Sequence, residues 1–144
     1  MQKLLVLLLA FVIILSFSGC NNENNTSNHE IVGTWQWDDR PTFFYNFDAD
    51  GTGFRDFEVD GQQFFVIFLW ELTEQDGQEA LILSSRRLNE EEKYDLAYER
   101  LGTRDVTVGI LGTHELLEIE IEGDILTITD ITASFDRNVW TRVR

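Results

Sequence analysis

Cysteine and histidine are scarce in this chain. Cys20 is the only cysteine, so no intramolecular disulfide is possible, and cysteine-based metal sites or thioredoxin-like motifs are excluded. His29 lies in a polar stretch and His114 stands alone. Because there is also no Gly-x-Ser-x-Gly motif, we expect no catalytic residues, no metal site and no cofactor, and we predict that the protein is not an enzyme.

Positive charge is also scarce. The chain has 11 Lys and Arg residues against 26 Asp and Glu residues, which gives a formal net charge of −15. Such an acidic protein is repelled by nucleic acid and by anionic lipid, so we expect no nucleic-acid partner. The acidic residues are scattered through the chain, which is typical of a solvated surface.

Only one long hydrophobic run is present, over residues 4–15, and it follows Lys3. A transmembrane helix needs about 20 predominantly apolar residues, so this run is too short to span a membrane. A positive residue, a short apolar run and the small residues at 16–19 together predict a cleaved secretory signal.

The residues that end this segment, Phe17-Ser18-Gly19-Cys20, resemble the bacterial lipoprotein box, although the family prefers Leu where Phe17 stands. The resemblance implies cleavage before Cys20 and attachment of fatty acyl chains such as palmitate to that residue. Two or more chains hold a protein stably on a membrane. We therefore expect a lipoprotein of the bacterial cell envelope, anchored on the outer side of the cytoplasmic membrane; the alternative is a free thiol after ordinary secretion.

The composition divides the chain into three parts. Residues 1–19 are the predicted signal peptide, and residues 20–29 are the lipidated cysteine with a polar linker that lacks the apolar residues needed to fold. Residues 30–144 form one domain of ordinary size.

Most of this domain alternates between apolar and polar residues with a period of two, which predicts β-strands. Residues 31–37 place Trp35 and Trp37 on one face, and residues 64–70 are apolar on both faces, as in a strand covered on each side. Asp50-Gly51 predicts a hairpin turn. The alternative, a calcium loop over residues 48–59, lacks the required final Glu because Val59 stands there.

One helix interrupts the strands. Asn89 can cap it, three glutamates follow, and Gly102 can end it. The helical spacing of Tyr94, Ala97, Tyr98 and Leu101 predicts a stripe that packs on the barrel wall. Strands are expected again over residues 104–110, 115–122, 125–131 and 136–143.

Eight or nine short strands with one helix favour a closed, all-β antiparallel barrel, because closure leaves no unprotected edges. Gly33-Thr34-Trp35 resembles the Gly-x-Trp signature of lipocalins, and Arg142 occupies the place of the arginine that packs on that tryptophan. The resemblance implies a small up-and-down lipocalin-like barrel in which Gly33, Trp35 and Arg142 have a structural, barrel-closing role. The chain looks closer to the lipocalin-like domains of bacterial lipoproteins than to typical lipocalins, since it is short and its helix precedes several strands.

Two functions are compatible with these predictions. The first is a non-catalytic binder of a small apolar or amphipathic ligand, and the aromatic residues that could line its pocket are Trp37, Phe43, Tyr45, Phe47 and Trp70. The second is a protein-interaction module with a packed core, such as an inhibitor or an envelope assembly factor. An eight-stranded barrel can either fill its interior with side chains or hold one small ligand, so the sequence leaves both open.

Overall fold

The computed structural model describes residues 30–130 and 136–144. The predicted signal, Cys20 and the linker lie outside the described residues. The strands and the helix are β1 (Gly33–Trp37), β2 (Arg40–Phe47), β3 (Thr52–Val59), β4 (Gln62–Gln75), β5 (Gln78–Ser84), α2 (Glu90–Leu101), β6 (Thr107–Ile110), β7 (Glu115–Glu122), β8 (Ile125–Asp130) and β9 (Asp136–Arg142). In this part of the chain, no helix has the length and apolar character needed to cross a membrane.

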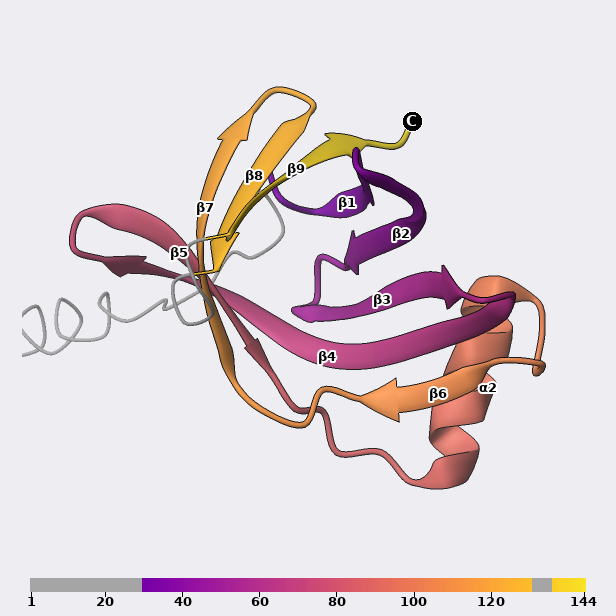
Figure 1. The fold of residues 1–144 in the computed structure, drawn as a ribbon. Coiled ribbons are helices and arrows are strands. Elements are labelled where there is room, and N and C mark those ends of the chain that lie inside the picture. The colour runs from indigo at the N-terminus through magenta and orange to yellow at the C-terminus, as the bar shows by residue number, and fades with distance from the viewer. Residues whose placement is uncertain (1–29, 131–135) are drawn as a thin grey trace, which may run out of the picture.

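Eight of the strands form a closed antiparallel barrel (Figure 1). The strand order is β3-β2-β1-β9-β8-β7-β5-β4, and β3 pairs with β4 to close the sheet. The first strand pairs with the last, with Trp35 opposite Arg142. The predicted fold class, a small lipocalin-like antiparallel barrel with one short helix, is confirmed.

Strand β6 departs from the predicted antiparallel pattern, since it runs parallel to β4. Strand β4 has 14 residues and spans more of the barrel wall than its neighbours. One of its edges carries β3, while the other carries β6 along Phe64–Ile67 and β5 along Leu69–Gln75. The helix α2 therefore lies between two strands that occupy successive parts of one edge.

The barrel has an inner core and a smaller outer core. The inner core includes the fully buried Trp35, Phe68 and Leu126. In the outer core, Phe54, Phe65 and Ile67 from the outer face of β3 and β4 pack against Ala97 and its neighbours on α2. This arrangement explains the sequence of residues 64–70, since one face of that strand points into the barrel and the other lies beneath the helix.

The ends of α2 agree with the prediction, but its buried face differs. The Asn89 side chain accepts from the backbone N–H of Glu92 in a capping box, and Gly102 ends the helix in the left-handed conformation. Ala97 is buried with Leu96 and Leu101, whereas Tyr98 is 54% exposed. The prediction that Tyr98 packs on the barrel wall was wrong, because the buried face is rotated toward Leu96 and Arg104 packs on the Tyr98 ring instead.

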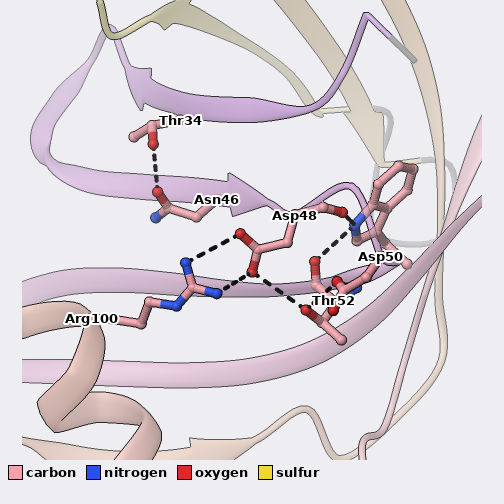
Figure 2. Close-up of polar contacts among 7 residues, drawn as sticks. Thr34, Asn46, Asp48, Asp50, Thr52 and Arg100 are labelled. Atoms are coloured by element: carbon pink, nitrogen blue, oxygen red, sulfur yellow. Dashed lines mark hydrogen bonds and ion pairs between the residues drawn. The ribbon is translucent and has the colours of Figure 1, made fainter. Parts of the chain in front are cut away.

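The turn between β2 and β3 joins the barrel to the helix, as Figure 2 shows. The Asp48 carboxylate accepts hydrogen bonds from both terminal nitrogens of Arg100, at 3.2 and 2.8 Å. The Asp50 carboxylate accepts from the backbone N–H and the hydroxyl of Thr52, and Gly51 supplies the positive φ of 82°. The predicted hairpin turn is therefore present. Within the described residues, no cluster of three or more His, Cys, Asp or Glu side chains could hold a metal ion.

One end of the barrel is filled by Trp35 and the residues around it. Trp35 is 0% exposed, its indole N–H donates to the Ile31 carbonyl at 2.7 Å, and the Arg142 guanidinium lies 4.1 Å from its ring centroid. A side chain at Gly33 would meet Arg142 at 2.8 Å, and the φ of Gly33 is +137°. We call this region the closed end, and it contains the three residues to which the resemblance assigns barrel closure.

Candidate functional site

Aromatic side chains gather inside the barrel beyond Trp35, toward the turns where β1 leads into β2 and β3 leads into β4. Trp37 stacks on Trp140 with ring centroids 5.6 Å apart, and Phe43 meets both rings edge-on at 5.6 Å. Phe43 also stacks on Phe57 at 4.7 Å, and Tyr45 lies 4.7 Å from Trp140. We call these five residues the aromatic end.

Strand register brings these residues together. Trp37 pairs with Trp140 across β1 and β9, and Phe43 pairs with Phe57 across β2 and β3. Side chains directly opposite each other in a sheet lie on the same face. The alternation of each strand then directs all of them toward the interior, on the same face as the buried Tyr45.

The aromatic end is partly open to solvent. Trp37, Phe43 and Phe57 are only half-buried, whereas Tyr45 and Trp140 are 5% and 3% exposed. The Arg40 guanidinium lies over the outer part of this region, 5.1 Å from the Trp37 ring centroid. Aromatic surface that water reaches at one end of a barrel is typical of a ligand-binding mouth.

Three buried N–H donors at this end have no hydrogen-bond partner among the described residues: Trp37 Nε1, Trp140 Nε1 and Arg55 Nε. A buried donor without a partner costs about 1–3 kcal/mol. The other two indoles of the described chain differ, because Trp35 donates to Ile31 and Trp70 donates to the carbonyls of Asp48 and Thr52. Among the tryptophans of the described chain, only the two at the aromatic end therefore lack a partner; elsewhere, Asp56 Oδ1 and Gln75 Oε1 are buried acceptors without one.

A half-buried ion pair lies beside these donors. Arg55 Nη2 contacts Glu115 Oε1 at 2.8 Å, and the guanidinium lies 5.4 Å from the Tyr45 ring centroid. Burial lowers the pKa of Arg55, but Tyr45 and Glu115 outweigh that effect and raise it, so the guanidinium stays charged. Burial raises the pKa of Tyr45 to about 12, which keeps its phenol neutral.

The five aromatic residues predicted as ligand-binding lie in one core cluster, in which Phe47 stacks on Tyr45 with ring centroids 5.5 Å apart, but only three of the five belong to the aromatic end. Trp37, Phe43 and Tyr45 belong to the aromatic end. Phe47 and Trp70 pack edge to face at 5.8 Å in the inner core and are 2% and 3% exposed. The Trp70 N–H donates to the Asp48 and Thr52 carbonyls, so Trp70 supports the turn after β2.

Four residues of the site were not among the predicted ones: Arg55, Phe57, Glu115 and Trp140. Alternation in the sequence places Arg55 and Phe57 on one face of a strand, and this was the available signal. The pairing of Arg55 with Glu115 joins residues separated by 60 positions, which no local pattern records.

The fold and the site together define an antiparallel β-barrel of lipocalin-like architecture with one filled end and one aromatic end. A search against protein-family models and a search of curated proteins both gave no match for this chain.

Proposed function

We propose that this protein is a membrane-tethered, non-catalytic binder of a small amphipathic ligand, held at the aromatic end of the barrel. The observation that carries the proposal is the set of three buried N–H donors without partners, on Trp37, Trp140 and Arg55. A ligand acceptor placed among them would supply the missing hydrogen bonds. The surrounding rings would cover its apolar part.

The charges at the site favour a neutral acceptor, such as a carbonyl or hydroxyl group. The Arg55 guanidinium is already paired with Glu115 at 2.8 Å. The Asp130 carboxylate adds a further negative charge, which contributes to the raised pKa of Tyr45. An anionic ligand would enter a site whose positive charge is already balanced, so we expect an uncharged polar group on an apolar body.

Native mass spectrometry of the protein purified from its own host tests this proposal. We expect an adduct of defined mass that is released on unfolding. The double variant Trp37→Phe/Trp140→Phe keeps two aromatic rings but removes two donors, so the occupancy of the adduct should fall by about tenfold or more.

Trp70→Phe is the matched control. It removes an indole N–H that the protein already uses, so it should lower stability without lowering the occupancy of the folded fraction. A wild-type protein that carries no adduct, or an equal loss of adduct in Trp70→Phe, would contradict the assignment of the ligand to the aromatic end.

The second candidate function is a packed-core protein-interaction module, such as an inhibitor or an envelope assembly factor. The fully buried Trp35, Phe47 and Phe68 fill the interior toward the closed end, which favours this alternative. A bare mass in the experiment above would support it, and crosslinking at the membrane would then search for the protein partner.

The tether is proposed from the sequence alone. The lipoprotein box before Cys20 supports lipidation of that cysteine and a place in the bacterial cell envelope. The membrane is then a partner through covalent lipid, and the polar linker at residues 21–29 would separate it from the barrel.

Replacing Cys20 by Ser removes the thiol that would carry the lipid. We expect the variant to accumulate as an uncleaved precursor or as a soluble, unlipidated protein, and cell fractionation with metabolic labelling by a fatty acid measures both. Asn21→Ser is a suitable control, since it changes a neighbouring polar residue and should retain labelling. Fatty-acid labelling of the Cys20→Ser protein at the wild-type level would refute the tether.

A further inference from the structure

A shallow, wide-open groove of about 580 Å³ lies where the barrel wall changes from β5 to β6. On one side is the segment that leads from β5 into α2, including Arg86, Arg87 and Leu88. On the other side are Ile110 and Leu111, at the end of β6. None of these residues belongs to the aromatic end.

The two arginines of this groove differ from the other arginines of the described chain. Arg55, Arg100, Arg104, Arg137, Arg142 and Arg144 each form an ion pair with a carboxylate, and Arg40 packs on Trp37. For Arg86 and Arg87, the described residues provide no ion pair, hydrogen bond or ring contact. In a protein with a net charge of −15, two adjacent cations without a carboxylate partner require an explanation.

Carboxylates are present nearby, but other groups already use them. Glu92 lines the groove, and its Oε2 accepts from the backbone N–H of Asn89 at 2.8 Å in the capping box. The hydrogen bonds from Thr52 lower the pKa of Asp50, and the charge of Arg86 lowers it further. Arg86 therefore feels the Asp50 charge without forming an ion pair with it.

The negative charge of the whole protein does not prevent a local anion site. At physiological ionic strength, exposed charges more than about 8 Å apart are largely screened. A guanidinium binds phosphate through two parallel hydrogen bonds, which act at short range. Affinity at this groove is thus set mainly by Arg86 and Arg87 and by the carboxylates of Glu92 and Asp50 near them.

We propose that the Arg86–Arg87 groove binds a phosphate group carried by an organic molecule. The two guanidinium groups provide donors for the phosphate oxygens. The half-buried Leu88 and Ile110 provide an apolar surface beside them for the organic part. Two sources have this chemistry: a soluble phosphate ester and the headgroup of an anionic phospholipid.

Titration of the purified full chain tests the proposal and distinguishes the sources. The protein is kept in nonionic detergent micelles at 0.15 M salt and titrated, by isothermal calorimetry, with glycerol 3-phosphate in one arm and with phosphatidylglycerol in mixed micelles in the other. Saturable binding in the first arm identifies a soluble phosphate ester, and saturable binding in the second arm alone identifies a lipid headgroup. Either supports the site, whereas no saturable binding in both arms overturns it.

Variants assign the binding to the groove. Arg86→Gln/Arg87→Gln should weaken the affinity by about tenfold or more, because it removes both charged donors. Arg104→Gln/Arg137→Gln removes the same charge from exposed ion pairs elsewhere and should leave the affinity within about twofold of wild type. Equal weakening by the two double variants would show general electrostatic attraction and overturn the proposal. Since this site and the aromatic end share no residue, loss of binding here leaves the adduct experiment unaffected.

Discussion

Replacing Trp35 by Ala is expected to lower the free energy of unfolding by about 3–5 kcal/mol. The side chain is 0% exposed, and its removal would leave a large cavity in the inner core. It would also remove the hydrogen bond to the Ile31 carbonyl and the surface on which Arg142 packs at 4.1 Å from the ring centroid. A cation over an indole contributes about 0.5–2 kcal/mol, and here it joins the first strand to the last. Urea denaturation followed by far-UV circular dichroism measures the change.

Two further variants separate the contributions to this loss. Trp35→Phe keeps an aromatic ring in the core but removes the N–H donor, so its loss should be smaller than that of the alanine variant. Tyr98→Ala truncates an aromatic side chain that is 54% exposed, and it should change stability by less than about 0.5 kcal/mol. If Trp35→Ala unfolded at the same urea concentration as wild type, the closed end would not contribute to holding the barrel shut.

The architecture could be predicted because alternation is a strong signal in a barrel with one dry face. Leu117 and Ile119 point inward, whereas Glu118 and Glu120 point outward, as the period of two requires. The ends of α2 could be predicted as well, since Asn89 and Gly102 act locally on the backbone. The parallel pairing of β6 could not be predicted, because its partner residues, Phe64–Ile67 of β4, lie 43 positions earlier in the sequence.

The candidate site was harder to predict than the fold. A list of aromatic residues cannot distinguish Trp70, whose N–H is bonded to two carbonyls, from Trp37, whose N–H has no partner in the described chain. That difference depends on which backbone carbonyls the indole can reach, and so on the register of strands distant in sequence. For the same reason, the Arg55–Glu115 ion pair at 2.8 Å cannot be predicted from the sequence, in which acidic residues are abundant.

The two ends of the barrel have different physical roles. At the closed end, the donors of Trp35 and Arg142 are used by the Ile31 and Val32 carbonyls at 2.7 Å. At the aromatic end, donors of the same kind are buried and unused by the described residues. A protein selected for stability alone would satisfy both sets, because each unused buried donor lowers stability. This contrast supports our proposal that the aromatic end is completed by a ligand.

Asp56 provides the second large prediction, which concerns pH. This residue lies on the outer face of β3, opposite Phe44 and Phe65 in register, and its Oδ1 is buried without a hydrogen-bond partner among the described residues. Burial raises the pKa of its carboxyl from the ordinary value of 3.8 to about 6. A carboxyl with a raised pKa in the folded state binds protons more tightly there than in the unfolded chain. Ionisation of Asp56 therefore lowers the free energy of unfolding as pH rises from about 4 to about 6, and this destabilisation is complete above about pH 6.

Replacing Asp56 by Asn should therefore stabilise the protein at pH 8 and have little effect at pH 4. A pKa raised from 3.8 to about 6 corresponds to about 3 kcal/mol. We expect a gain of about 1–2 kcal/mol, because the side chain is only half-buried and solvent screens part of the effect. Urea denaturation at a series of pH values measures it. Asp39→Asn, at an exposed position, makes the same change in net charge and controls for general repulsion in this acidic protein. Equal stabilisation by both variants at pH 8 would assign the effect to overall charge, whereas a gain confined to Asp56→Asn would locate it in the buried carboxylate of β3.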